Sequence, residues 1–143
     1  MLVNISEDFS QKRELINEEV GKPFPLEERE RIAGTHIQNI PVTAASLKIY
    51  NLLMLNEGSS TCSLELRPKG IIIGFRGGSE TYALVIPYYK LRVYKGRPEQ
   101  YAFYKDQHFI KIMAKKDDPE IHRFIKKITH FKAGTRSSRI EDL

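Results

Sequence analysis

Five basic and aromatic residues lie close together in the second half of this sequence, and they are the residues best suited to binding chemistry. They are Lys90, Arg92, Tyr94, Lys95 and Arg97. Alternate residues of a strand point to one face, so Lys90, Arg92 and Tyr94 would lie together on a sheet. Arginine and tyrosine on an exposed face can contact a protein partner, and the same groups can stack bases or hold phosphates. The alternative is a solvated sheet face whose long cationic side chains cover apolar surface and discourage edge pairing.

Two further cations on neighbouring predicted strands, Lys105 and Lys111, could extend this surface. Tyrosines 88, 89 and 94 would supply contact area for a protein. No helix-turn-helix, zinc-finger or RNP-type motif accompanies these residues. We therefore expect a protein partner or self-association, with anionic membrane lipid or nucleic acid as the alternative, and we infer no small-molecule substrate.

Other residues that could do chemistry lack the spacing that catalysis or metal binding requires. Two of the four histidines, His122 and His130, lie about two helical turns apart, too far to share one metal ion without further ligands. The glycine-rich stretch 74–78 lacks the Lys-Ser/Thr ending of a phosphate loop, and no serine stands in a Gly-x-Ser-x-Gly setting. We expect a non-enzymatic protein with no cofactor and no metal.

Charge and composition fit one domain. The 143-residue chain has a formal net charge of +5 and a pI near 9.3, which permits attraction to anionic partners without requiring it. The single cysteine, Cys62, excludes an internal disulfide and alternates with Leu64 and Leu66, so we expect an inert buried thiol. The sequence shows no signal peptide and no apolar run long enough to span a bilayer, so we expect a cytoplasmic protein.

The residues of interest lie within a succession of short alternating segments joined by tight turns. Such a succession without interleaved helices predicts an antiparallel meander. The first segment is predicted as a strand covered on both faces, although periodicity alone leaves a buried helix open. The seven predicted strands are Leu47–Leu55, Cys62–Leu66, Ile71–Phe75, Thr81–Ile86, Tyr89–Tyr94, Gln100–Tyr104 and His108–Ala114.

One amphipathic helix follows the strands. Asp118 is suited to the N-cap, Pro119 to the first helical position, and Gly134 to the position just after the helix end. An apolar stripe along this helix must be buried against a sheet or barrel mouth. Its members are Ile121, Phe124, Ile125, Ile128 and Phe131.

The residues before the strands differ in character. Capping and periodicity predict a helix from about Ser6 to Val20, with Phe9 and Ile16 on its apolar stripe, and a second short helix over residues 26–33. Residues 35–45 are predicted as an edge strand or an extended connector. The expected division is an N-terminal helical extension (1–45), which packs on its own domain or on a second copy of the chain, a main domain (46–132) and a flexible tail (133–143).

The strand succession, the C-terminal helix and the step Ile86-Pro87-Tyr88 into a strand resemble the pleckstrin homology superfold, in particular bacterial pleckstrin-homology-like domains. The resemblance covers the last two-thirds of the chain. It implies two nearly orthogonal sheets that form a partly open barrel of about seven antiparallel strands, with the C-terminal helix closing one end. The expected fold class is therefore α+β, mainly β. A lipocalin-like or other small barrel is the chief competitor.

The sequence departs from the pattern of the lipid-binding members of this superfold. Phosphoinositide-binding members of the superfold are similar to one another in a basic cluster that spans the first strand, the first turn and the second strand. Here the matching turn, residues 56–60, contains Glu57, and the flanking strands offer Lys48 and Arg67. We therefore assign no lipid-site residue by resemblance.

Overall fold

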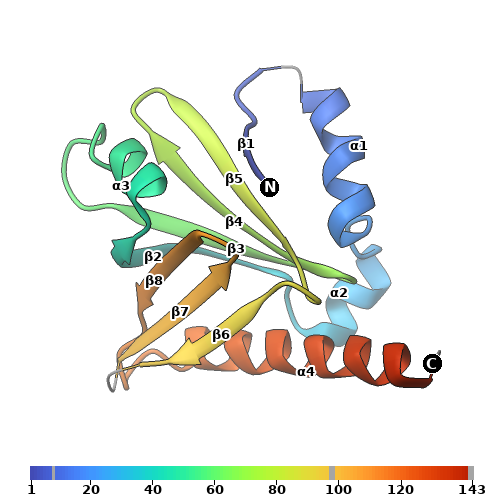
Figure 1. Cartoon of the computed structure of the whole chain (residues 1–143). Helices are drawn as coiled ribbons and strands as arrows, with labels where there is room; N and C mark the ends of the chain where they lie inside the picture. The colour runs from blue at the N-terminus through green and yellow to red at the C-terminus, as the bar shows by residue number, and fades with distance from the viewer. Residues whose placement is uncertain (8, 97–98, 142–143) are drawn as a thin grey trace.

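A computed structural model of the chain describes residues 1–7, 9–96 and 99–141 (Figure 1). The strands are β1 (Leu2–Asn4), β2 (His36–Ala45), β3 (Thr61–Arg67), β4 (Gly70–Gly77), β5 (Glu80–Pro87), β6 (Arg92–Lys95), β7 (Gln100–Lys105) and β8 (His108–Met113). The helices are α1 (Phe9–Val20), α2 (Leu26–Ile32), α3 (Leu47–Leu53) and α4 (Pro119–Glu141).

The strands form one antiparallel arrangement in the order β1-β5-β4-β3-β2-β8-β7-β6. Strand β2 belongs to both halves, because residues 36–41 pair with β3 and residues 42–45 pair with β8. It changes partner between two register irregularities, and Asn39, with a φ of 59°, lies within the first. In the part of the chain that the structure describes, β5 and β6 do not pair, so the barrel is open along that seam. The predicted α+β class with a partly open barrel is confirmed.

Helix α4 packs into the barrel through the predicted apolar stripe, of which Ile121, Phe124, Ile125 and Ile128 are buried. In Figure 1 it runs along the bottom of the view, below β6 and β7. The rings of Phe131 and Phe24 lie 5.5 Å apart, so residues outside the strands also contribute to this packing. The predicted helix end at Gly134 is wrong, because α4 continues to Glu141.

The segment predicted as the first strand is helix α3, so the strand prediction for Leu47–Leu55 is wrong. Two residues one turn apart, Ile49 and Leu53, are buried, whereas Leu47 is 75% and Met54 63% exposed. An apolar run of this length is compatible with a buried strand or a helix, and here only one helical face meets the core. The first strand of the seven-strand barrel is β2 instead.

The N-terminal residues pack on the same chain. Strand β1, which periodicity did not indicate, pairs with β5, and the predicted helix α1 lies over the outer face of β4 and β5. Ile16 and Val20 of α1 are buried with Ile72, Ala83 and Val85, while the side chain of Phe9 lies outside the described part. Strand β2 is neither an edge nor a connector, because it joins the two halves of the sheet.

Candidate interaction surface

Cross-strand register places several of the predicted residues on the outer face of β6, β7 and β8. Arg92 is opposite Tyr104, which is opposite Phe109, and Tyr94 is in the same row as Lys111. Residues directly opposite one another in an antiparallel sheet point to the same face. We call this set the aromatic face: Arg92, Tyr94, Tyr104, Phe109 and Lys111.

Three aromatic rings form a continuous row across this face. The centroids of Tyr94 and Tyr104 lie 5.5 Å apart in an edge-to-face arrangement, and those of Tyr104 and Phe109 are also 5.5 Å apart. The ammonium group of Lys111 lies 5.7 Å from the centre of the Phe109 ring. Each aromatic contact contributes about 0.5–1.5 kcal/mol beyond burial, so the row is held in place. Tyr94 forms its outer end and is 52% exposed.

The other predicted cations lie elsewhere. Lys95 is opposite the buried Tyr101 and therefore belongs to the inner side of the sheet, where it is exposed at the barrel end. Lys90 lies in the turn before β6, because the strand begins only at Arg92. Arg97 lies outside the described residues.

The prediction that Lys105 extends the surface is wrong. This side chain is buried, and its ammonium group donates a hydrogen bond of 3.3 Å to the Val85 carbonyl oxygen on β5. A buried ammonium group needs such a partner, and the Val85 carbonyl, which also accepts a 2.7 Å hydrogen bond from the Met1 amino group, supplies it. Lys111, in contrast, does lie on the predicted face.

The three tyrosines proposed as contact area differ in exposure. Tyr88 is fully buried, its hydroxyl group donates a 2.8 Å hydrogen bond to the Arg67 carbonyl oxygen, and burial raises the pKa of Tyr88. It is therefore a core residue. Tyr89, at 60% exposure, and Tyr94 remain accessible.

A pocket of about 510 Å³ opens where β5 and β6 separate, next to α4. Its charged lining residues come from three parts of the chain: Lys90 and Arg92 around the start of β6, Asp106 in the turn between β7 and β8, and Lys132 on α4. We call it the seam pocket. The sequence analysis grouped Lys90 with Arg92 but gave no signal for Lys132, which lies forty positions after Arg92.

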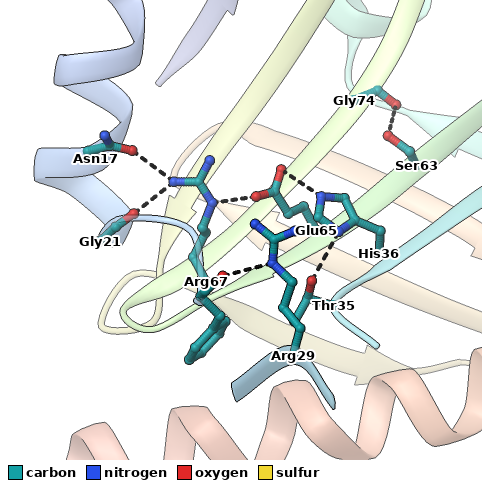
Figure 2. Close-up of polar contacts among 10 residues, drawn as sticks. Asn17, Gly21, Arg29, Thr35, His36, Ser63, Glu65, Arg67 and Gly74 are labelled. Atoms are coloured by element: carbon teal, nitrogen blue, oxygen red, sulfur yellow. Dashed lines mark hydrogen bonds and ion pairs between the residues drawn. The ribbon is translucent and has the colours of Figure 1, made fainter. Parts of the chain in front are cut away.

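A partly buried polar network that the sequence analysis missed lies on the other half of the sheet (Figure 2). The Arg67 guanidinium is buried and donates hydrogen bonds to the Asn17 side-chain oxygen at 2.9 Å and to the Gly21 carbonyl at 2.8 Å. It also pairs with the carboxylate of Glu65, whose other oxygen lies 3.4 Å from His36 Nε2. The alternation that buries Leu64 and Leu66 could have placed both charges on the outer face. This network fastens the end of α1 to β3.

A groove of about 750 Å³ lies beside this network, over the outer face of β3, β4 and β5. Its lining includes three small residues that lie in one cross-strand row: Ser63, Gly74 and Ala83. A Cβ atom at Gly74 would lie 2.7 Å from Ser63 Oγ, so the sheet surface is lowest there. The groove thus comes from small side chains next to the part of the sheet that α1 covers.

The structure places Cys62 in the core and His122 in a hydrogen-bonded position on α4. The Cys62 thiol is buried, which confirms the predicted burial, and burial raises its pKa to about 12. That the thiol is inert stays a prediction. His122 accepts a hydrogen bond from the Tyr101 hydroxyl at Nδ1, at 2.8 Å, and its Nε2 donates one to the Lys115 carbonyl at 3.0 Å.

Among the residues that the structure describes, no three His, Cys, Asp or Glu side chains lie close enough together to hold a metal ion. In the same part of the chain, none of the helices has the length and apolarity needed to cross a membrane.

Comparison with known proteins leaves the family open. No family model matches the sequence, and no curated protein matches it. Among solved structures, the chain is similar to Vav1 in a structure with an allosteric inhibitor, where Vav1 inhibitors block GEF activity, at 9% identity and a TM-score of 0.41. That alignment covers 85% of this chain and 22% of the Vav1 chain. A TM-score at this level establishes neither shared fold nor shared function.

Proposed function

We propose that this protein is a non-enzymatic interaction module of pleckstrin-homology-like fold that binds a protein partner through the aromatic face and the free edge of β6. The observation that carries the proposal is the aromatic row ending in the half-exposed Tyr94, with Arg92 and Lys111 beside it. Tyrosine, phenylalanine and arginine are enriched where protein partners meet, and rings already held by neighbours lose little conformational freedom on binding.

The position of the row at a sheet edge supports the same proposal. In the described part of the sheet β6 pairs with β7 alone, so its other side presents backbone N–H and C=O groups. A partner strand can add to such an edge, and side chains next to the edge then select it. Tyr94 and Arg92 are the side chains in that position.

Self-association through the N-terminal segment receives less support. The apolar stripe of α1 is buried on its own sheet through Ile16 and Val20, and β1 already pairs with β5. A second copy of the chain would therefore use the aromatic face or the β6 edge, as another protein would.

Binding of anionic membrane lipid or nucleic acid through the basic sheet face is the alternative function. Arg92 and Lys111 are the cations of the predicted set that lie on the aromatic face, whereas Lys90, Lys95 and Lys105 lie elsewhere. Two cations among three rings suit a protein contact better than a clamp for several phosphates. Sedimentation with anionic and neutral vesicles at two salt concentrations tests this alternative, because phosphate contacts weaken steeply with salt.

The experiment for the proposed function is site-specific photocrosslinking. A photoreactive phenylalanine analogue replaces Tyr94 in one variant and Tyr50 in the control, since Tyr50 on α3 is 48% exposed and lies off the aromatic face. In extracts of the source cells, we expect a discrete adduct from position 94 that excess unlabelled wild-type protein competes away. Purified protein alone reveals whether the adduct is a second copy. Equal adducts from both positions, or none from position 94, would contradict the proposal.

A further inference from the structure

We propose that the seam pocket is a binding site for a phosphomonoester group, next to the aromatic face, with which it shares Arg92. The pocket has a volume of about 510 Å³ and is lined by Lys90, Arg92 and Lys132 together with Asp106. Three cations against one carboxylate leave two positive charges, which matches the roughly −1.5 to −2 charge of a phosphomonoester near pH 7. The volume exceeds a phosphate group, so part of the molecule that carries it can enter as well.

The cations come together because the fold joins distant segments. In Figure 1 the connection between β5 and β6 lies above α4, and the ammonium group of Lys132 on α4 donates a 3.0 Å hydrogen bond to the Tyr88 carbonyl in that connection. The buried Tyr88 side chain is itself fixed by its hydrogen bond to the Arg67 carbonyl. The wall of the pocket that carries Lys132 is therefore held before any ligand arrives.

The charges of Lys90 and Arg92 have no carboxylate partner among the residues that the structure describes. The ammonium group of Lys90 lies 5.9 Å from the centre of the Tyr89 ring, which leaves hydrogen-bond donors for a ligand. By contrast, the buried Arg67 is paired with Glu65, and the buried Lys105 donates to a carbonyl. Like charges placed around one pocket repel each other, and a bound dianion removes that repulsion.

Substitution of Asp106 should change anion binding in the opposite direction from substitution of a cation. It lies in the turn after β7 with a φ of 53° and lines the same pocket. A carboxylate there opposes anion binding, so D106N should strengthen binding, whereas loss of a cation should weaken it. A site that existed only through general surface charge would not depend on these particular positions.

The experiment is an NMR titration of the ¹⁵N-labelled full chain with inorganic phosphate, with sodium chloride holding the ionic strength constant. We expect saturable shifts in the amides of residues 88–92 and 132, about tenfold weaker binding for K90Q and for K132Q, and tighter binding for D106N. K126Q is the matched control, because Lys126 is exposed on α4 outside the pocket. Lys90 is also exposed, so K90Q should fold normally even if K132Q disturbs the contact with Tyr88.

A second arm identifies the source of the group. Vesicles of phosphatidylcholine, with and without phosphatidic acid, present a phosphomonoester on a membrane. Phosphate binding without vesicle binding supports a free phosphorylated molecule, and vesicle binding that K90Q and K132Q both weaken supports the same pocket with a lipid headgroup. Linear, non-saturable shifts, or equal weakening by K126Q, would overturn the proposal. Lys90 and Lys132 lie outside the aromatic face, so failure here leaves the proposed protein contact untouched.

Discussion

Cys62 is a residue whose reactivity is set entirely by its position in β3. Its thiol lies in the core, and burial raises its pKa to about 12. The thiolate, which is the reactive form, is therefore scarce at neutral pH. We predict that Ellman's reagent at pH 8 modifies the native protein only slowly and modifies the urea-unfolded protein at once. Complete reaction of the native protein within the mixing time would contradict the buried placement.

Gly70, at the start of β4, lies close to both β5 and α1. A Cβ atom there would lie 2.8 Å from Pro87 Cα and 2.5 Å from Val20 Cγ1, and it would also clash with the Ile86 carbonyl oxygen. Backbone cannot move aside as a flexible side chain can. We predict that G70A lowers the free energy of unfolding by about 3 kcal/mol in urea titrations. Its control is G96A, because Gly96 has open space around its α-carbon and should change stability by less than about 0.5 kcal/mol.

At the scale of elements, α4 provides a test of where a helix ends. Gly134 would favour a left-handed C-terminal position if the helix stopped there, but it lies within α4, has open space around it and has no positive φ. Alanine is a better helix former than glycine by about 1 kcal/mol. We predict that G134A raises the free energy of unfolding by up to that amount. A loss of stability in the same urea titration would instead support a helix end at residue 134.

Elements with a clear period were predictable from the sequence, and those defined by distant contacts were not. The stripe from Ile121 to Ile128 and the alternation in β3 each specify one buried face, so the helix and the strand follow directly. The apolar run that forms α3 lacks a clear pattern of apolar and polar positions, so only its packing against the core determines which face is buried. Strand β2 contains Pro41, which is typical of an edge, yet its bends allow it to pair on both sides in turn.

The sequence likewise predicted only part of the candidate site. Alternation correctly put Arg92 and Tyr94 on one face, because both lie in a single strand. It could not reveal that Lys105 reaches the Val85 carbonyl, or that Lys132 reaches the connection before β6. Those contacts depend on how the strands pack and on where α4 docks. The seam pocket is thus a product of the tertiary fold.

At the scale of the whole molecule, positive charge from distant parts of the chain collects around His108. The neighbourhood of His108, at the start of β8, includes Lys48 from α3, Lys105 from β7 and the amino group of Met1, with Asp106 as the opposing charge. Burial first, and then these cations, lower the pKa of His108 below its ordinary value of 6.5. Part of the charge repulsion within a protein of formal net charge +5 therefore acts on His108.

This lowered pKa predicts how acid affects the fold. Because the unfolded chain binds the His108 proton more readily than the folded chain, the contribution of this group to stability is complete above about pH 6.5 and falls as the pH drops toward the folded pKa. We predict that H108Q, which cannot be protonated there, loses less unfolding free energy than wild type between about pH 6.5 and pH 5. Urea titrations at several pH values measure the difference, and 0.5 M sodium chloride should reduce the part due to Lys48 and Lys105 by screening. Parallel pH profiles for wild type and H108Q would mean that the surroundings of His108 do not disfavour the charged imidazole.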